Sequence, residues 1–451
     1  MILSLSQTRR FTLLILLALF TGILFLSFVP TSHSYYSYYI TPPHSSSPSS
    51  ATNQHSTLSP TDPNCDPFNL NTHLHYNKTY PLETHFTTYD HICEASHPLW
   101  VTQLWELESN DPPLEALKDK TVLFIGDSVD RFLLYDLCTF LNGTFSMHPI
   151  DSYKKTINDT VVKAHHALPR SCVIDGPSGK QGLVLMNYFF YGFDENDMWR
   201  DKVSTWSEPP RFKDRWEMFE FEAYPSIFGE EGILAGRDGP DLVIVNMGFW
   251  ELARFDRLDE QRQFREGVDD EELVDPVTVN EGFVEEFIGK TVEFLGRLRR
   301  LVGGDARIRW RQMHTPSIST GPYFIDHNTG TKKKSRGRFT PVKIRVLNEA
   351  AEWACEVASG NEAERKRRER SESGQWEKGG ESWWRKVEEE EVQEVQEDGR
   401  ITVWPVGDLM APWPTRQWLR DDVHPTESAG VMVWGGGVFE YLARTLKRKS
   451  G

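Results

Sequence analysis

The stretch TVLFIGDSVDRFLLYDLC, residues 121–138, decides the fold class. Its opening residues are almost continuously apolar, which is typical of a strand covered on both faces. From Ser128 to Leu141, apolar residues recur at three- and four-residue spacing, which predicts an amphipathic helix. A strand that passes through Gly126-Asp127-Ser128 directly into a helix predicts one unit of an α/β fold.

Further strand and helix patterns alternate along the chain. Short apolar runs occupy residues 183–192, 241–248, 307–313 and 401–406, and helical spacing recurs over Val284–Val302 and Pro341–Ala358. This alternation predicts a three-layer α/β/α domain with a mostly parallel sheet, over residues 63–446. A low-complexity stretch of mixed charge, about residues 361–400, reads as a solvated insertion. Chemistry in such folds collects at the carboxyl ends of the strands.

The N-terminal region predicts a membrane anchor. Residues 11–29 are uncharged and apolar, and a helix of that length crosses the hydrocarbon core. Arg9 and Arg10 precede it, and no Lys or Arg follows until Lys78. The asymmetry predicts a cytosolic tail at 1–10 and a lumenal domain, as in a type II protein of the secretory pathway. A stem of the Golgi type after the anchor favours the Golgi as its location. Residues 30–62, rich in Ser, Pro and Thr, predict a disordered stem. The alternative is a cleaved signal peptide that frees a secreted lipase.

Composition narrows the class of protein. With 39% hydrophobic residues, the chain has enough apolar material for a large core. A net charge of −16 provides no basic field for phosphate backbones, so nucleic acid is not an expected partner. The cysteines lack the close spacing of a zinc site, and no metal is predicted. In an oxidising lumen the candidate pairs are Cys65 with Cys93 and Cys138 with Cys172, which leaves Cys355 over. Candidate glycosylation sites are Asn77, Asn142 and Asn158.

Ser128 is the candidate nucleophile. It follows a predicted strand at the start of a helix, where backbone N–H groups point toward an oxyanion formed in front of it. Gly126 permits a sharp turn. The alternative is an ordinary helix cap, for which Asp and Ser are favoured residues.

The candidate general base is His424, in WLRDDVHPTESAG. A serine hydroxyl needs an imidazole to take its proton, and the imidazole needs an acceptor that fixes its tautomer. Asp421 lies three residues earlier, a spacing that lets its carboxylate fold back onto the ring, although the adjacent Asp422 is an alternative partner. His314, in WRQMHTPS, has no acid at useful spacing before it, so it is interpreted as a pocket or structural residue.

Oxyanion donors are expected in DLVIVNMGFWEL, where Asn246 ends a predicted strand and Gly248 lets backbone approach a substrate. The Ser128 backbone N–H is the other predicted donor. The alternative interpretation is a plain turn, in which Asn and Gly are common.

Gly-Asp-Ser after the first strand, an Asn-bearing strand end and Asp-x-x-His before a last helix occur here in the order found in the SGNH or GDSL hydrolase superfamily. The chain resembles the PC-esterase branch in particular, which includes trichome-birefringence-like and other polysaccharide O-acetylating proteins. Further similarities are Arg131 after the serine, the NMGFW form ending in Trp250, and the signal anchor. The glycine of the second block is assigned to Gly192 in NYFFYGFD.

The resemblance implies a flavodoxin-like domain, a triad of Ser128, His424 and Asp421, and acetyl transfer to or from a glycan. Arg131 and Trp250 would line the acceptor site, with the indole face against a sugar ring. No bound cofactor is expected, and the acyl donor would be acetyl-CoA or an acetyl ester, with a separate donor supplier as a partner. An esterase with the same triad and a catalytically inactive scaffold that binds glycan or protein are the alternatives.

Overall fold

The protein is described from a computed structural model. The described residues are 65–68, 72–80, 83–88, 93, 117, 119–148, 154–157, 160–163, 168–175, 181–196, 198, 211–269, 273–274, 276–303, 305–317, 339–360 and 400–446. The predicted membrane anchor, the stem, Asn158 and residues 361–399 of the predicted insertion lie outside these ranges. Within the described residues, no helix combines the length and apolar character that a membrane span requires.

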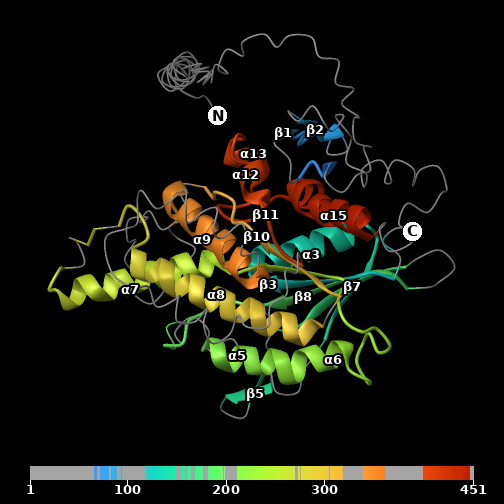
Figure 1. Ribbon diagram of the computed structural model, residues 1–451, viewed down its shortest axis with the longest axis horizontal. Helices are drawn as coiled ribbons and strands as arrows, with labels where there is room; N and C mark the ends of the chain where they lie inside the picture. Colours follow the sequence, from blue (N-terminus) through green and yellow to red (C-terminus); the bar gives the residue numbers. More distant parts are fainter. Residues whose placement is uncertain are drawn as a thin grey trace, which may run out of the picture. The chain divides into compact units, whose positions relative to one another are not determined.

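A sheet of seven strands forms the centre of the domain, in the order β11-β10-β9-β3-β8-β7-β4 (Figure 1). Five neighbouring strands run parallel. They are β3 (Thr121–Gly126), β8 (Gln181–Phe189), β9 (Leu242–Asn246), β10 (Arg307–Arg311) and β11 (Ile401–Trp404). Each coincides with one of the five apolar runs of the sequence, so the predicted mostly parallel sheet is confirmed. β3 ends at the same residue as its run, and the other four strands end two or three residues before theirs.

The five parallel strands follow the order 2-1-3-4-5 when they are numbered along the chain, with β8 second and β3 first. This is the order of doubly wound, flavodoxin-like sheets, in which ligands bind where the direction of winding reverses, between the first and third strands. Here that switch point lies between the carboxyl ends of β3 and β9. The parallel pairing of Gly126 with Asn246 places the residues after both strands at one edge.

Two further strands extend the sheet beyond β8. β7 (Arg170–Asp175) pairs antiparallel with β8, and β4 (Thr144–Met147) pairs antiparallel with β7. Separate two-stranded hairpins are formed by β1 (Thr72–His75) with β2 (His85–Thr88), and by β5 (Lys154–Ile157) with β6 (Thr160–Lys163). None of these was expected from the sequence, because short edge strands carry little periodic signal.

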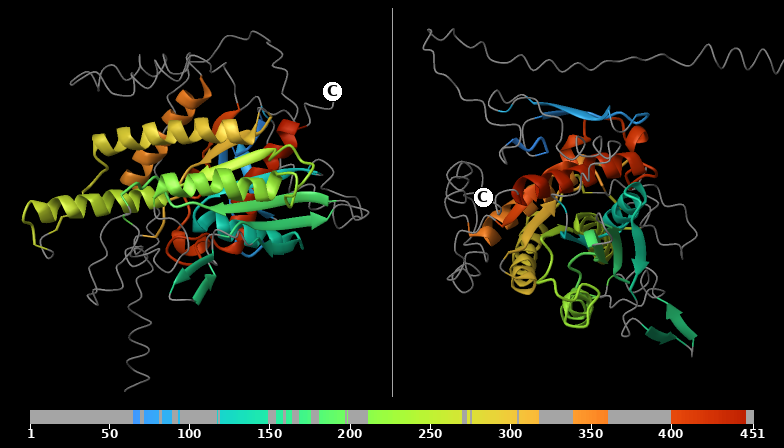
Figure 2. Two further views of the ribbon diagram at one scale, coloured as in Figure 1. Left: turned by 90° about the horizontal axis from the view of Figure 1, so that it is seen from below. Right: turned by 90° about the vertical axis from the view of Figure 1, so that its right-hand side faces the viewer.

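Helices cover both faces of the sheet (Figure 2). Along β3, Val122 and Phe124 pack into one cluster, and Leu123 and Ile125 into the other. The first face carries α3 (Ser128–Phe140), η9 (Gly430–Gly435) and α15 (Gly436–Leu446). The second carries α5 (Phe212–Met218), η6 (Phe219–Ala223), α6 (Tyr224–Phe228), α7 (Gly248–Arg265), α8 (Glu281–Val302) and α9 (Pro341–Ser359). The predicted helices are α3, α8 and α9, and the three layers are those expected.

Two disulfides join the predicted cysteine pairs. Cys65 bonds to Cys93, and Cys138 of α3 bonds to Cys172 of β7. The second bond links the helix that begins at Ser128 to the antiparallel end of the sheet. Cys355 is free and buried in α9.

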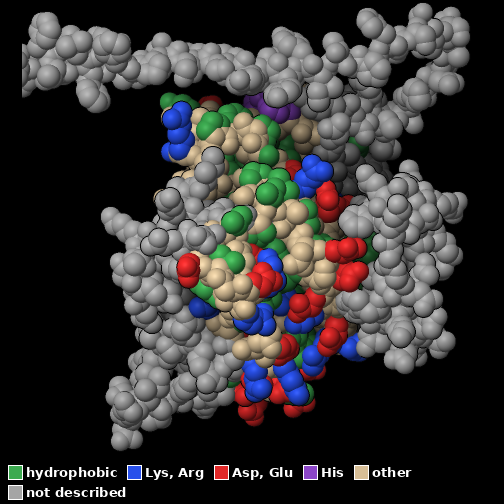
Figure 3. All heavy atoms as spheres, turned by 90° about the vertical axis from the view of Figure 1, so that its left-hand side faces the viewer, with side chains coloured by type: hydrophobic (Ala, Val, Ile, Leu, Met, Phe, Trp, Pro, Cys, Tyr) green, Lys and Arg blue, Asp and Glu red, His purple; other side chains and the backbone are tan. Residues whose placement is uncertain are grey.

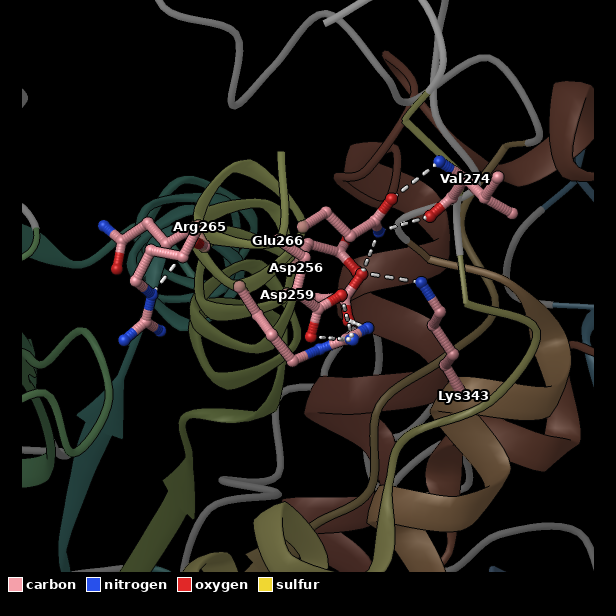
Figure 4. A network of polar contacts seen from close by, with 9 residues as sticks. Asp256, Asp259, Arg265, Glu266, Val274 and Lys343 are labelled. Atoms are coloured by element: carbon pink, nitrogen blue, oxygen red, sulfur yellow. Dashed lines mark hydrogen bonds and ion pairs between the residues drawn. The ribbon is translucent and has the colours of Figure 1, made fainter. Parts of the chain in front are cut away.

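Polar contacts attach the start of α9 and the segment around Val274 to α7 (Figure 4). Lys343 forms a buried ion pair of 2.8 Å with Asp256. Gln263 uses both ends of its amide on the backbone of Val274, at 2.7 and 2.9 Å. Acidic and basic side chains are interspersed on the face seen in Figure 3, which agrees with the absence of a single-sign basic patch there.

Candidate active site

Ser128 is the first residue of α3 and follows β3 with only Asp127 between them. Asp127 caps the helix, because its carboxylate accepts a 2.8 Å hydrogen bond from the N–H of Val129. The N–H of Ser128 has no acceptor within the helix, as for every residue of a first turn. Its hydroxyl is half-buried and lies at the switch point of the sheet. These features fit the predicted nucleophile and its predicted backbone oxyanion donor.

Gly126 is required by its surroundings. A Cβ at this position would lie 1.9 Å from Oδ2 of Asp130 and 3.0 Å from the carbonyl oxygen of Asn246. Asp130 cannot move away easily, because it is fully buried and forms a two-pronged ion pair with Arg311 of β10, at 2.8 and 2.9 Å. The turn below Ser128 is therefore fixed by close packing around a buried charge pair.

Asp127 is also completely buried beside this pair. Burial and the neighbouring charge of Asp130 together raise the pKa of Asp127 to about 6, against the opposing effect of Arg311. Two carboxyl groups thus lie within one turn of the candidate nucleophile, and only one of them is paired with the guanidinium through hydrogen bonds. Burial of two carboxyl groups in the nucleophile turn costs free energy.

The candidate base reaches Ser128 from the other end of the chain. Nε2 of His424 lies 2.7 Å from Oγ of Ser128, and Nδ1 lies 2.7 Å from Oδ2 of Asp421. A carboxylate only accepts hydrogen bonds, so Nδ1 carries the proton and Nε2 accepts from the serine hydroxyl. The three residues form one continuous hydrogen-bonded series, in which each link has the length expected for proton transfer.

Asp421 is held in its ionised form. Burial raises the pKa of Asp421, but hydrogen bonds from the His424 ring and from the backbone N–H groups of His424 and Val423 outweigh it and bring the pKa to about 2. The two backbone bonds measure 2.7 and 2.8 Å. For Asp422, the alternative partner, the backbone carbonyl oxygen accepts a 2.9 Å hydrogen bond from the N–H of Ser317. Of the two acids, Asp421 is the one that the structure joins to His424.

Backbone hydrogen bonds close the turn that carries both residues. Leu419 and Pro425 form an antiparallel bridge, and the N–H of Arg420 donates to the carbonyl of His424 at 2.8 Å. We call residues 419–425 the acid–base turn. Its short span places Asp421 and His424 side by side, and the bonds between these two residues lie within the turn.

One face of α3 contacts the acid–base turn. Ser128, Phe132 and Asp136 follow each other at four-residue spacing and therefore lie on one side of the helix. The hydroxyl of Ser128 forms a hydrogen bond with Nε2 of His424, and the Phe132 ring contacts the His424 ring edge-on at a centroid distance of 4.7 Å. Asp136 forms an ion pair with the guanidinium of Arg420. The sequence contains this spacing, but nothing in it says which segment the face contacts.

His314 was interpreted from the sequence as a pocket or structural residue, and it supports the acid–base turn from the opposite side. The ring is fully buried, and its Nε2 donates to the carbonyl of Val423, directly before His424, at 2.7 Å. Burial lowers the pKa of His314 to about 3, so the ring is neutral at physiological pH. The rings of Trp418, Trp434 and Phe249 contact it edge-on. Its role in this geometry is to fix a carbonyl.

The predicted oxyanion residues Asn246 and Gly248 lie at the expected strand end but are occupied by structural bonds. The amide of Asn246 is fully buried; its Nδ2 donates to the carbonyl of Arg311, and its Oδ1 accepts from the N–H of Gly248 at 3.2 Å. The Gly248 N–H is thus already bonded, and a Cβ there would lie 2.4 Å from Sδ of Met313. One hydrogen of the Asn246 amide remains for an oxyanion, so that part stays a prediction.

Trp250 does not offer the open ring face predicted for a sugar. Its indole is only 7% exposed and packs against the rings of Phe189 and Tyr191 at centroid distances of 6.4 and 5.4 Å. Phe189 at the end of β8 and Tyr191 just after it cover the indole ring. The sequence could not show that these residues lie against Trp250. Arg131 is half-buried on α3, with its guanidinium 5.3 Å from the centre of the Phe189 ring, near the nucleophile.

Gly192 follows β8 with φ of +80°, a conformation that favours glycine, and a Cβ would lie 2.4 Å from Oε1 of Glu251. Its carbonyl accepts from Arg215 at 2.6 Å. The glycine is thus needed for the path of the chain at the carboxyl edge of the sheet. Its assignment to the second block of the resembled family stays a prediction.

Two predicted glycosylation sites are described. Asn142 is exposed in the turn after α3. Asn77 is partly exposed in the turn between β1 and β2, where its Oδ1 accepts from the N–H groups of Thr79 and Tyr80 and its Nδ2 donates to Glu83. The Nδ2 amide carries two hydrogens, so attachment of a glycan to Asn77 would still leave one hydrogen for the bond to Glu83.

In the described part of the chain, no group of three His, Cys, Asp or Glu side chains is arranged to hold a metal ion. Comparisons of the chain with protein-family models, with curated proteins and with solved structures found no match. The geometry of the site is therefore the basis on which a function is proposed.

Proposed function

We propose that this chain is a serine-dependent O-acyl transferase that places acyl groups, most simply acetyl, on a glycan in the secretory pathway. The observation that carries the proposal is the hydrogen-bonded series from Asp421 through His424 to Ser128. A serine bonded to a buried imidazole, which is itself bonded to a carboxylate, is the arrangement that activates a hydroxyl for attack on an ester or thioester.

In the first half-reaction, Oγ of Ser128 attacks the carbonyl carbon of the donor while Nε2 of His424 takes the hydroxyl proton. Asp421 stabilises the imidazolium that forms. The Ser128 N–H, with the remaining amide hydrogen of Asn246, would stabilise the oxyanion. The tetrahedral species collapses to an acyl-serine as His424 returns the proton to the leaving alcohol or thiol. The donor would be acetyl-CoA or an acetyl ester, and no bound cofactor enters these steps.

In the second half-reaction, His424 removes a proton from a sugar hydroxyl, whose oxygen attacks the acyl-serine. Collapse releases the acylated sugar and returns the proton to Oγ of Ser128. Arg131 would contribute to the acceptor site, since it lies three residues after Ser128 on α3. Trp250 is not proposed for this role, because its ring is covered.

Several features support the wider proposal. The strand order 2-1-3-4-5 and the position of Ser128 at the switch point agree with the flavodoxin-like arrangement of SGNH proteins. The apolar run at 11–29, with arginines before it, supports a type II membrane protein with this domain in the Golgi lumen. Two disulfides are in keeping with an oxidising compartment. A glycan acceptor and a separate supplier of acyl donor are the partners proposed.

Hydrolysis of carboxyl esters is the second candidate. The side chain of Asp421 is 44% exposed, so the triad has a side open to solvent. Water that reaches the acyl-serine would compete with a sugar hydroxyl, and the two activities share the whole of the first half-reaction.

The test uses full-length protein in detergent with p-nitrophenyl acetate, with and without candidate oligosaccharides whose masses are then measured. Ser128→Ala is the inactive comparison, and Ser226→Ala, in helix α6 on the other face of the sheet, is the matched control. Acetylated sugar that appears with wild type and the control but not with Ser128→Ala supports the transferase. Release of p-nitrophenol that sugars do not change, with no acetylated sugar, supports the esterase. Equal inertness of folded wild type and Ser128→Ala would overturn both and favour a binding scaffold.

A further inference from the structure

Arg420 belongs to the acid–base turn and makes two hydrogen bonds within it. Its backbone N–H donates to the carbonyl of His424 at 2.8 Å, and its Nε donates to the carbonyl of Pro425 at 2.6 Å. These carbonyls belong to the base itself and to the residue after it. The side chain thus folds over the turn, and the other N–H groups of its planar guanidinium remain as donors for a second partner.

The other end of the guanidinium is bonded to the helix of the nucleophile. Its terminal nitrogen Nη2 forms an ion pair with Oδ2 of Asp136, which lies two turns after Ser128 on the same face of α3. Asp136 is almost fully buried, whereas the side chain of Arg420 is 30% exposed. One side chain therefore joins the element that carries Ser128 to the turn that carries His424.

Phe132 lies between these contacts and the catalytic ring. The guanidinium of Arg420 is 5.0 Å from the centre of the Phe132 ring, and that ring meets the imidazole of His424 edge-on at 4.7 Å. The Phe132 ring of α3 thus contacts the imidazole of His424, and the guanidinium of Arg420 packs against the same Phe132 ring. Any shift of the guanidinium would change the packing of the ring that supports His424.

We propose that Arg420, through its ion pair with Asp136, is a positioning residue that holds Nε2 of His424 at hydrogen-bonding distance from Oγ of Ser128. The nucleophile and the base lie 296 residues apart in sequence, so their separation is set by how the acid–base turn docks on α3. Arg420 connects the two elements directly. The inference rests on the proposed function for the chemical role of Ser128 and His424. The positions of the two residues do not depend on that function.

A merely structural role predicts a different result from a positioning role. Because Arg420 is 30% exposed, loss of this pair should cost less stability than loss of the fully buried pair of Asp130 with Arg311, and we expect the domain to stay folded. A displacement of about 1 Å between reacting groups, however, lowers rates by as much as roughly 100-fold. The rate constant for attack by Ser128 should therefore fall much more than the melting temperature, while the affinity for a small reagent stays unchanged.

The experiment measures labelling of Ser128 in the full-length protein by a fluorophosphonate, with the inactivation rate constant separated from the binding constant. We expect Arg420→Gln to lower the inactivation rate constant about 10- to 100-fold without changing the binding constant. Arg420→Lys, which keeps the charge but not the planar fork, should recover part of the loss. Asp136→Asn should resemble Arg420→Gln, and the double variant should be no slower than either. Arg345→Gln, which removes an exposed helix pair with Glu349, is the matched control.

A crystal structure of folded Arg420→Gln gives a readout that needs no activity. We expect the 2.7 Å separation between Oγ of Ser128 and Nε2 of His424 to lengthen. If it stays at that value, or if the variant labels at the wild-type rate, the positioning role is overturned. Wild type that is labelled but acylates no sugar and hydrolyses no ester would overturn the proposed function and leave this inference standing on the rates. If wild type is not labelled at all, the proposed function fails and the crystal structure decides the positioning role.

Discussion

Around Ser128 the chain is fixed by buried charges and close packing, whereas around His424 it is fixed by hydrogen bonds in a turn that is partly open to solvent. Gly126, Asp130 and Arg311 leave no space at the nucleophile turn. On the acid–base side, Asp421 is 44% exposed and the turn is closed by backbone bonds. The two halves of the candidate triad thus have different supports.

Because of this difference, we expect substitutions in one region to change the free energy of unfolding and those in the other to change the reaction rate. The nucleophile turn belongs to the core, so changes there should act first on the free energy of unfolding. In the acid–base turn Val423 and His424 are buried, but Asp421 is exposed, so a change at Asp421 should act first on the rate. Each of the following predictions tests one side of that division.

Asp421→Asn should have the largest effect, and on rate alone. Asparagine can present its amide N–H to the imidazole, which would put the ring proton on Nε2 and remove the acceptor for the serine hydroxyl. We expect acyl transfer or ester hydrolysis to fall roughly 10³- to 10⁴-fold, with little change in the melting temperature. The rate is measured with p-nitrophenyl acetate. Asp422→Asn is the matched control, and an equal loss in both variants would contradict the assignment of Asp421.

Arg311→Met should have the largest effect on stability. It leaves the fully buried carboxylate of Asp130 without its ion-pair partner, which costs about 3–5 kcal/mol. The free energy of unfolding is measured by urea denaturation followed by tryptophan fluorescence. The double variant Arg311→Met with Asp130→Leu should recover much of the loss, because no unpaired charge is then buried. A single variant as stable as wild type would show that the nucleophile turn does not depend on this pair.

Asp127→Asn should have the smallest effect, with the opposite sign. The pKa of Asp127 is raised from 3.8 to about 6, so the folded protein holds a proton that the unfolded chain has lost between these values. Stability from this group is full below pH 3.8 and is lost as pH rises through 6, a difference of at most about 3 kcal/mol. Asparagine still caps the helix and does not titrate. The variant should therefore match wild type near pH 4 and exceed it at pH 7.5 in thermal melts.

A cap exchange elsewhere is the control for that result. Thr340 caps α9 by accepting from the N–H of Lys343. Thr340→Asn should change stability by the same amount at both pH values, because neither side chain titrates. A gain for Asp127→Asn that is likewise independent of pH would mean that the carboxyl group is not the cause.

Local patterns in the sequence were sufficient for much of the fold. The five parallel strands and helices α3, α8 and α9 were found because a continuous apolar run or a 3.6-residue repeat lies within each element. Strands β4 and β7 were missed, since four to six residues at the antiparallel end of a sheet show no distinct period. Helix α7 was also missed, because its NMGFW start was interpreted only as a strand end and turn.

For the site, the sequence by itself determined which residues are the candidate nucleophile and the candidate base. Ser128 follows from a strand, a Gly-Asp-Ser turn and a helix in succession, and the Asp-x-x-His spacing places an acid beside His424. Both are relations between neighbours in the chain. Only the tertiary structure decided which acid faces the ring, and that Trp250 is covered by side chains from β8.

The supporting contacts were likewise decided by the fold. Asp130 meets Arg311 across 181 residues, Asp136 meets Arg420 across 284, and His314 meets Val423 across 109. Periodicity reports how one element presents its own faces, whereas these bonds depend on how separate elements dock against one another. The sequence thus specifies the candidate groups, and the packing of β10 and the acid–base turn around α3 specifies the distance between them.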